Sequence, residues 1–351
     1  MLIADEVGLG KTIVAKGIIA KAFKHYLEQY ENVKKQNPTF NVVYICSNLA
    51  LANQNIRKLN FTGKDECVED TINRLNYLAI DNKEKQQLFK INSLTPGTSF
   101  DQRSSTGEAR ERLILYKLLT AYDVFEKRSN GLIWILKGAS HIDSMKAMVT
   151  YDPIVLRSDL YKRFRDELSR IAITKERLPK INAALNSSVE TTLWKGLQRL
   201  AESIDGRNHH TFSFQNEIIK ELRRILAYLC LDYLGADIFI LDEFQRYANL
   251  IKTDVTDDPA VELARRVFQV ENAKVLMLSA TPFKPYTNDF DEASGEVHYK
   301  EFKSVLQFLM ERESESFWKE FEEDRKSLYQ IIRHSEKLGD VFEKGIAKKE
   351  K

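Results

Sequence analysis

The chain opens with Met1-Leu-Ile-Ala-Asp-Glu-Val-Gly-Leu-Gly-Lys-Thr-Ile13, and this stretch decides the fold. The apolar run at residues 2–4 is typical of a strand, and the apolar periodicity of residues 13–30 predicts a helix. Glycine tolerates positive φ and lets the backbone approach a ligand closely, so Gly8 and Gly10 suit a loop that wraps around phosphate oxygens. The N–H groups of such a loop and of the helix N-terminus point at the anion. The opening therefore predicts a phosphate-binding loop between a strand and a helix.

The end of this loop matches the pattern G-x-x-x-x-G-K-[ST] of P-loop NTPases. Lys11 would place its charge beside the β- and γ-phosphates of ATP, and the Thr12 hydroxyl could hold Mg²⁺. Asp5 departs from the pattern, because it stands where the first glycine is expected. The residues that we expect to bind the nucleotide are Asp5, Glu6, Val7, Gly8, Leu9, Gly10, Lys11 and Thr12.

Two carboxylates end a second apolar run, Asp237-Ile-Phe-Ile-Leu-Asp-Glu243. In P-loop NTPases an Asp in this position contacts Mg²⁺, and an adjacent Glu can accept a proton from the attacking water. Ligands of open α/β sheets bind at the carboxyl ends of the strands, so Asp242, Glu243 and the glycine loop could share one crevice. The alternative is that the two carboxylates are only the solvated start of a helix.

Strand and helix patterns alternate at both ends of the sequence and predict an α/β fold. Strands are expected at 41–46, 88–94, 237–243 and 274–282, and helices at 49–59 (capped by Ser47 or Asn48), 71–79 and 260–270. Between them the periodicity is mostly helical, at 109–127, 158–173, 191–204 and 212–234, while 131–136 fits either a buried helix or a strand. The tail from about 299 is helical and charged.

We therefore expect a RecA-like P-loop parallel sheet with helices on both faces, interrupted by a large, mostly helical insertion. Its parts would be 1–100 and 236–285 for the sheet lobe, 101–235 for the insertion and 286–351 for a charged helical segment. A length of 351 residues suits about two average domains, or one domain with an insertion.

The composition narrows the class of protein. With 43% hydrophobic and 30% charged residues, the chain is typical of a soluble globular protein. The net charge is only +2, so the overall charge gives no argument for nucleic acid, and any basic surface must be local. No apolar run approaches the ~18 residues of a membrane span, and no leader precedes the first strand. Because the chain begins almost on that strand, we expect a fragment or a truncated product.

The cysteines indicate the compartment. Cys46, Cys67 and Cys230 lie far apart with no C-x-x-C spacing, so they predict neither a disulfide framework nor a zinc site. A reducing, cytoplasmic location is the simplest interpretation, with no contact to a membrane.

Several segments resemble the motifs of a known family. Ala4-Asp-Glu-Val-Gly-Leu-Gly-Lys-Thr12, Asp242-Glu-Phe-Gln245 and Ser279-Ala-Thr281 resemble motifs I, II and III of superfamily-two helicases and translocases. The Asp-Glu form of the loop resembles the Swi/Snf-like branch, particularly bacterial RapA-type ATPases, and accounts for Asp5. Residues 43–54 resemble motif Ia, although Ser47 replaces the usual proline and Asn55 the following tryptophan; residues 93–99 resemble motif Ib.

The resemblance covers residues 1–100 and 236–285 and implies a nucleic-acid-dependent ATPase that uses ATP and Mg²⁺. It implies Glu243 as the catalytic base, assisted by Asp242, Lys11 and Gln245, with Thr12 and Asp242 on the metal. Coupling to the nucleic acid would involve Gln245, Ser279 and Thr281. The residues implied to contact the phosphate backbone are Ser47, Asn48, Gln54, Thr95, Gly97 and Thr98. The alternatives are helix capping for Asn48, surface polarity for Gln54 and strand-end turns for Ser279 and Thr281.

Such motors hold ATP between two RecA-like lobes, and the second lobe supplies arginine fingers worth ~10³–10⁵ in rate. No second lobe pattern follows Thr281, and the adenine-reading segment expected upstream is missing. We expect the chain alone to bind ATP weakly and to hydrolyse it slowly, with the second lobe supplied by the same intact chain or by a partner.

The leading interpretation is the first lobe of a translocase on double-stranded DNA. The alternatives are a single-strand DNA or RNA helicase lobe, an ATP-responsive binding or regulatory module that needs a partner chain, and an unrelated P-loop class.

The predicted insertion contains basic and aromatic clusters, at Tyr161-Lys-Arg-Phe-Arg165, Trp194-Lys195 and Arg207-Asn-His-His210. Basic residues interleaved with aromatics can stack bases and neutralise phosphates. The alternative is that the aromatic residues belong to the core and the cations to the solvated surface. We expect the insertion to act as a lever or a partner-docking element beside the nucleic-acid track.

Overall fold

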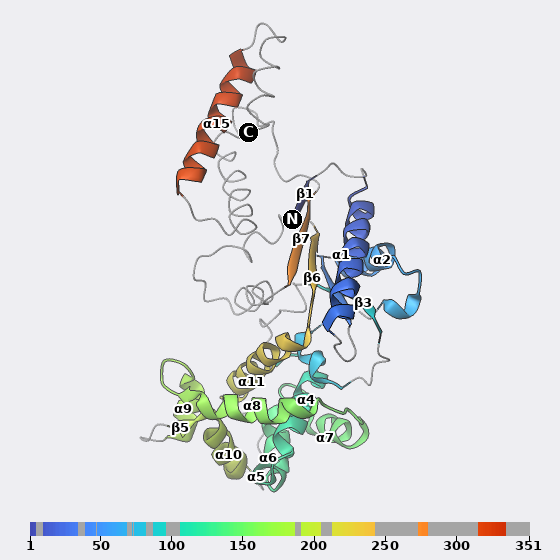
Figure 1. The fold of residues 1–351 in the computed structure, drawn as a ribbon. Coiled ribbons are helices and arrows are strands. Elements are labelled where there is room, and N and C mark those ends of the chain that lie inside the picture. Colours follow the sequence, from blue (N-terminus) through green and yellow to red (C-terminus); the bar gives the residue numbers. More distant parts are fainter. Residues whose placement is uncertain are drawn as a thin grey trace. The chain divides into compact units, whose positions relative to one another are not determined.

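The computed structural model describes residues 1–4, 10–33, 39–46, 48–68, 72, 74–81, 87–95, 106–186, 191–204, 213–242, 273–279 and 315–334. The chain divides into two compact units, residues 1–301 and residues 302–351. In the second unit the described element is the helix α15 (Glu315–His334), which falls in the predicted helical tail (Figure 1).

A five-stranded parallel sheet forms one part of the first unit (Figure 1). Its strands follow the order β1 (Leu2–Ala4), β7 (Lys274–Ser279), β6 (Ile238–Asp242), β2 (Phe40–Ile45) and β3 (Phe89–Leu94). Every neighbouring pair is parallel. The α/β class and the five strands are confirmed, whereas residues 5–9 of the expected P-loop and the helix expected at 260–270 lie outside the described part.

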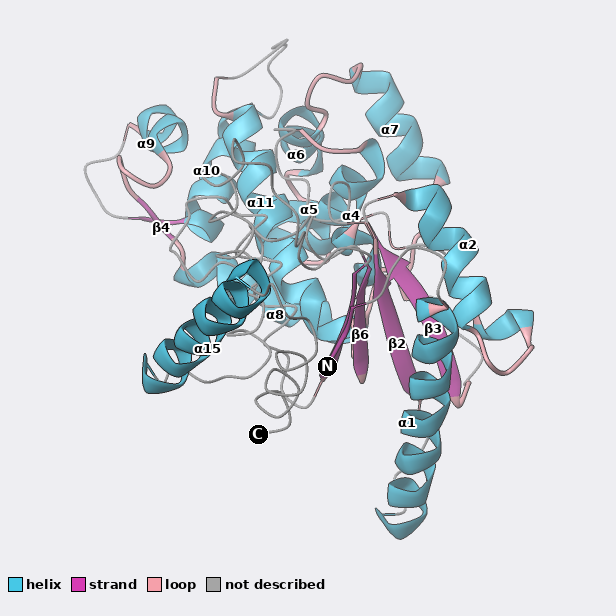
Figure 2. Cartoon of the chain, turned by 90° about the horizontal axis from the view of Figure 1, so that it is seen from above, coloured by secondary structure: helices cyan, strands magenta, loops and turns pink. Residues whose placement is uncertain are grey.

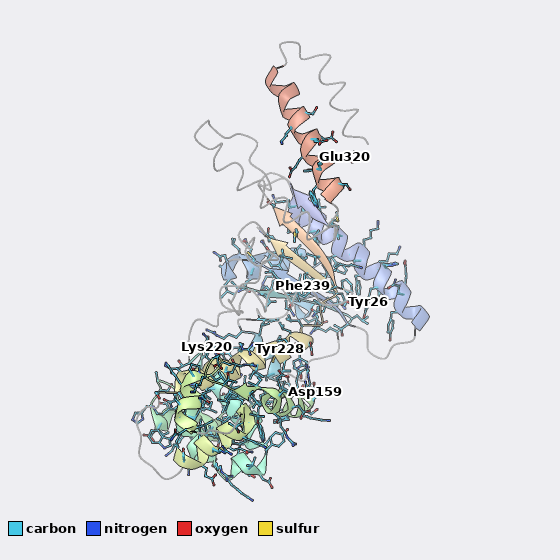
Figure 3. All side chains as sticks on the ribbon, turned by 90° about the vertical axis from the view of Figure 1, so that its left-hand side faces the viewer. Tyr26, Asp159, Lys220, Tyr228, Phe239 and Glu320 are labelled. Carbon is cyan, nitrogen blue, oxygen red and sulfur yellow. The ribbon has the colours of Figure 1, made fainter. Side chains whose placement is uncertain are left out.

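The near-continuous apolar runs form strands because both faces of this sheet are buried. On one face Tyr44, Ile240 and Leu278 share a core cluster with residues of α1 (Lys11–Val33) and α2 (Leu49–Leu59). Figure 2 shows both helices beside β2 and β3. Residues that alternate with this set, such as Phe239, are buried as well (Figure 3).

A helical group with its own core occupies the chain between β3 and β6. Its helices are α4 (Ala109–Thr120), α5 (Asp123–Glu126), α6 (Ser129–Leu136), α7 (Ile142–Tyr151), α8 (Ser158–Arg170), α9 (Pro179–Leu185), α10 (Leu193–Ile204) and α11 (Gln215–Cys230), with a short antiparallel pair β4 (Ala172–Ile173) and β5 (Thr191–Thr192). The helical character is confirmed. Figure 1 shows these elements gathered together.

Some predicted bounds were wrong. The periodicity at 109–127 spans two helices, because the backbone is extended at Tyr122 (φ −112°, ψ 128°), the N-cap of α5. The Tyr122 hydroxyl donates to the carbonyl of Tyr161 at 3.0 Å. The ambiguous run 131–136 lies in the helix α6. Residues Leu75–Ala79 form a 3₁₀ helix, η2, which covers only part of the α-helix expected at 71–79; another, η1 (Asp65–Cys67), precedes it and a third, η3 (Leu231–Tyr233), follows α11.

The segment around η2 connects the sheet to the helical group. It precedes β3 in the chain, yet Ala79 belongs to the helical core and its carbonyl accepts from the Arg157 amide at 3.0 Å. At the other end of the group, η3 leads into β6, where the Asp237 carboxylate accepts from the Asn41 amide of β2 at 2.7 Å. In both contacts a backbone amide is the donor; the acceptor is a backbone carbonyl at Ala79 and a side-chain carboxylate at Asp237.

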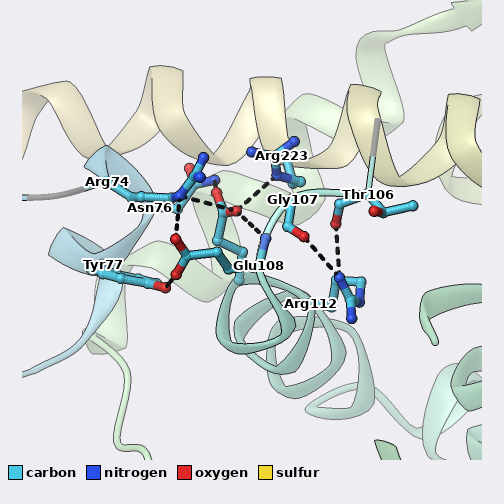
Figure 4. A network of polar contacts seen from close by, with 9 residues as sticks. Arg74, Asn76, Tyr77, Thr106, Gly107, Glu108, Arg112 and Arg223 are labelled. Atoms are coloured by element: carbon cyan, nitrogen blue, oxygen red, sulfur yellow. Dashed lines mark hydrogen bonds and ion pairs between the residues drawn. The ribbon is translucent and has the colours of Figure 1, made fainter. Parts of the chain in front are cut away.

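A buried charge network fixes η2 to α4 and α11 (Figure 4). The Glu111 side chain, 1% exposed, accepts from Asn76 Nδ2 at 2.6 Å and from the Glu108 amide at 2.8 Å. Arg223 Nε, on a side chain with no exposed surface, lies 3.1 Å from Glu111 Oε2. Gly107 has a φ of +57°, and a Cβ there would clash with the Arg223 guanidinium. Glycine at this position lets the backbone reach the buried ion pair.

We expect Glu111→Gln to destabilise the chain by about 3–5 kcal/mol, because it removes the carboxylate that pairs with the buried Arg223 guanidinium. Unfolding in urea, followed by circular dichroism, measures the change. The matched control is Glu28→Gln, since the side chains of the Lys24–Glu28 pair are 79% and 58% exposed and such pairs contribute about 1 kcal/mol at most. Equal costs for the two variants would contradict the prediction.

None of the helices in the described part of the chain is both long enough and apolar enough to cross a bilayer. Cys46, Cys67 and Cys230 are all buried.

Candidate nucleotide-binding site

The carboxyl ends of three neighbouring strands meet at one edge of the sheet. In the register of the sheet, Ala4 of β1 lies opposite Ser279 of β7, and Leu278 lies opposite Asp242 of β6. Strands in a sheet are about 4.8 Å apart, so the ends of β1 and β6 are separated by about 10 Å, with the end of β7 between them. The predicted glycine loop and the predicted metal-binding carboxylate therefore start from the same edge.

The helix α1 begins at this edge. Gly10 has the positive φ expected of it, +90°, and its carbonyl accepts from the Ile13 and Val14 amides at 2.8 and 3.1 Å. Among the described residues, an added Cβ would meet the tip of Ile13 at 3.9 Å, and the positive φ by itself favours glycine here. Lys11 and Thr12 follow as the first two residues of α1, both half-buried. The sequence motif predicts that Lys11 binds phosphate and that Thr12 binds Mg²⁺, so both predicted ligands lie in the first turn of α1.

Asp242, the last residue of β6, is held by two polar side chains that the sequence analysis did not assign to the site. The Tyr44 hydroxyl donates to Asp242 Oδ2. Asn55 Nδ2 donates to the Tyr44 hydroxyl at 2.8 Å and lies 3.5 Å from the same carboxylate oxygen. The signals in the sequence were a tyrosine inside a mostly apolar strand and the departure at Asn55 from the family pattern.

The strand register explains why Tyr44 reaches Asp242. Tyr44 lies opposite Ile240, so Asp242 is its diagonal neighbour on the same face of the sheet, within reach of an aromatic side chain. Burial raises the pKa of the Tyr44 hydroxyl, and the negative charge of Asp242 raises it further. The hydroxyl therefore keeps its proton at any physiological pH and acts as the donor.

The predicted coupling residues are only partly described. Ser279 ends β7, between the ends of β1 and β6, and is fully buried. Glu243, Gln245 and Thr281 lie outside the described part of the chain.

Asn48, expected at the nucleic-acid interface, is the N-cap of α2. Its side-chain oxygen accepts from the amides of Ala50 and Leu51 at 2.9 and 3.2 Å. Gln54 is exposed on the same helix, and Thr95, just after β3, is buried. Three more residues of the expected interface, Ser47, Gly97 and Thr98, are outside the described ranges.

We expect Asn48→Ala to lower the free energy of unfolding by about 1 kcal/mol, because it removes the cap of α2. Gln54→Ala on the exposed surface of the same helix is the control and should stay within about 0.5 kcal/mol of the parent chain. Thermal unfolding of both variants provides the measurement. If the two behave alike, Asn48 does not cap the helix in solution.

The basic and aromatic residues at 161–165 are used within the helical group. Phe164 is buried in its core. The Arg163 guanidinium pairs with Asp159 at 3.4 Å and with Asp232, and the Arg165 guanidinium lies 5.4 Å from the centre of the Tyr122 ring. These contacts favour the structural interpretation of this cluster. Residues 207–210 lie outside the described part.

Among the described residues, no group of three or more His, Cys, Asp or Glu side chains could hold a metal ion. Mg²⁺ in nucleotide sites requires fewer protein ligands, because it keeps several waters and binds one or two side-chain oxygens together with phosphate oxygens. The Thr12 hydroxyl and the Asp242 carboxylate are hard oxygen donors of this kind. The donor set therefore fits a Mg²⁺–nucleotide complex.

Comparison of the chain with protein-family models, with curated proteins and with solved structures finds no match.

Proposed function

We propose that this chain is the ATP-binding first lobe of a Swi/Snf-like, nucleic-acid-dependent ATPase that translocates on double-stranded DNA. The observation that carries the proposal is the meeting of β1, β7 and β6 at one edge of a parallel sheet, where α1 also begins. Ligands of open α/β sheets bind outside the carboxyl ends of the strands, and anions bind at helix N-termini. A triphosphate at this edge would lie outside the carboxyl ends of the strands and beside the N-terminus of α1.

Each residue at this edge would bind a different part of the Mg²⁺–ATP complex. The Lys11 ammonium would neutralise the β- and γ-phosphates, while Thr12 and Asp242 would hold Mg²⁺, which bridges phosphate oxygens and offsets their charge. Glu243, which follows Asp242 directly, would orient the attacking water and take its proton. Hydrolysis would also need cationic groups on the far side of the γ-phosphate, such as the arginines of a second lobe.

The strand β7 supports the coupling part of the proposal. It lies between β1 and β6, so Ser279 at its end stands between the glycine loop and Asp242. A group in this position would respond to the presence of the γ-phosphate and pass a shift to the segment after β7. The match of Ser279-Ala-Thr281 to motif III supports this role.

Calorimetry of ATP binding in the presence of Mg²⁺ tests the site directly. We expect the 351-residue chain to bind ATP, and Lys11→Ala to weaken binding about 10-fold or more, because one charged hydrogen bond contributes about 1.5–3 kcal/mol. Lys21→Ala is the control, since Lys21 is exposed on the same helix about 15 Å further along its axis. No binding, or equal binding by both variants, would refute the proposal.

The ATP hydrolysis rate with and without nucleic acid tests the class of enzyme. We expect slow turnover, about 10³-fold or more below that of a site with an arginine finger, and stimulation by duplex DNA. The assay compares no polymer, duplex DNA, single-stranded DNA and RNA. Stimulation by single strands alone would favour the helicase alternative, and ATP binding without any stimulation would favour a regulatory module.

A further inference from the structure

The contacts around Asp242 join three elements that are distant in the sequence. Asp242 ends β6, Tyr44 lies in β2, 198 positions earlier, and Asn55 lies in α2. Asn55 donates to the Tyr44 hydroxyl, which donates to Asp242 Oδ2. Asn55 Nδ2 also lies 3.5 Å from Asp242 Oδ2. The Tyr44 hydroxyl, Asn55 Nδ2 and Asp242 Oδ2 are therefore the three corners of a closed triangle of contacts.

We propose that Tyr44 and Asn55 are positioning residues, which hold the Asp242 carboxylate in the orientation that a nucleotide-bound Mg²⁺ requires. This inference rests on the proposed function. It adds two residues from the segment expected to contact nucleic acid to the machinery of the nucleotide site.

Packing alone does not account for the two polar side chains. Tyr44 is 1% exposed and is surrounded in its core cluster by apolar residues such as Val42, Ile240 and Leu278. A phenylalanine would fill the same space without a hydroxyl, and a buried hydroxyl costs free energy unless it is hydrogen-bonded. The hydroxyl is stable here because it donates a hydrogen bond to Asp242 and accepts one from Asn55.

For a carboxylate that binds a metal ion, these contacts would fix the orientation of the group. A carboxylate has about four acceptor sites, and a donor on Oδ2 fixes the rotation of the group about its last bond. Such outer partners of metal ligands restrict the orientation in which the ligand meets the ion, and losing one costs about 10–100-fold in metal affinity or activity. Both donors are neutral and leave the charge of the carboxylate in place.

The test compares ATP dissociation constants in excess Mg²⁺ and in EDTA, measured by calorimetry on the 351-residue chain. The dissociation constant in EDTA divided by that in Mg²⁺ is the metal-dependent gain in affinity. We expect Tyr44→Phe to lower this ratio about 10-fold or more and to leave the affinity in EDTA unchanged, because the phosphate contacts of the glycine loop are intact. Asn55→Ala should also lower the ratio.

A double variant tests the connection between the two residues. If Asn55 acts partly through the Tyr44 hydroxyl, Asn55→Ala should have a smaller effect in the Tyr44→Phe background than in the parent chain. Independent, fully additive effects would contradict the closed triangle.

Tyr26→Phe is the matched control, because it removes another hydroxyl from the same core cluster; that hydroxyl donates to the Thr39 carbonyl at 3.4 Å. Neither dissociation constant should change. A Tyr44→Phe variant that weakens binding equally in Mg²⁺ and in EDTA has only a structural role, which overturns the inference. Should Tyr44→Phe fail to fold, Asn55→Ala on the half-buried face of α2 decides the question by the same ratio.

Asp242→Asn separates failure of the inference from failure of the proposed function. If it abolishes the metal-dependent gain while Tyr44→Phe and Asn55→Ala leave the gain intact, only the inference is wrong. If Asp242→Asn leaves the gain intact, or the parent chain shows no gain, the proposed metal site is wrong and the inference falls with it.

Discussion

Parallel pairing of β1, β7 and β6 is the constraint on which the rest of this structure depends. Parallel strands present all their carboxyl ends at one edge, so the register that sets Ala4 against Ser279 and Leu278 against Asp242 also sets the candidate site. Lys11 and Asp242, one from each half of that site, are 231 positions apart in the sequence. Under the proposed function, the glycine loop and the carboxylate could bind one nucleotide only because the sheet brings them to the same edge.

The helical group adds a second core without interrupting the sheet. Two neighbouring segments are fixed by specific polar contacts: η2, which precedes β3, through Glu111 and Asn76, and the residue before β6 through the bond between the Asp237 carboxylate and the Asn41 amide. Because η3 and residues 234–237 connect α11 to β6, the strand that ends on Asp242 is attached to the helical group at one end and to the candidate site at the other. A displacement of α11 would therefore act on β6 through the seven residues 231–237.

The strands were predictable because burial on both faces requires near-continuous apolar runs, which the sequence shows at 41–46, 237–241 and 274–278. The errors fell where tertiary contacts override local periodicity. No glycine or proline marks the break at Tyr122, where the backbone is extended and the side chain contacts the distant Tyr161 carbonyl. Residues 131–136 fit either structure by composition, and only the packing of the helical core selects the helix.

The site was predictable as far as its motifs reach, and no further. Lys11, Thr12 and Asp242 follow from local patterns, but the contact between Tyr44 and Asp242 depends on which strands are neighbours and in what register, and no local pattern carries that information. The result gives α2 two roles. Its first turn is capped by Asn48, in the segment expected to contact nucleic acid, and its second turn carries Asn55, which contacts Tyr44 and Asp242. Since one short helix moves as a unit, a shift of α2 at its first turn would change the contacts of the Asp242 carboxylate, and this is a direct physical connection between the two expected sites.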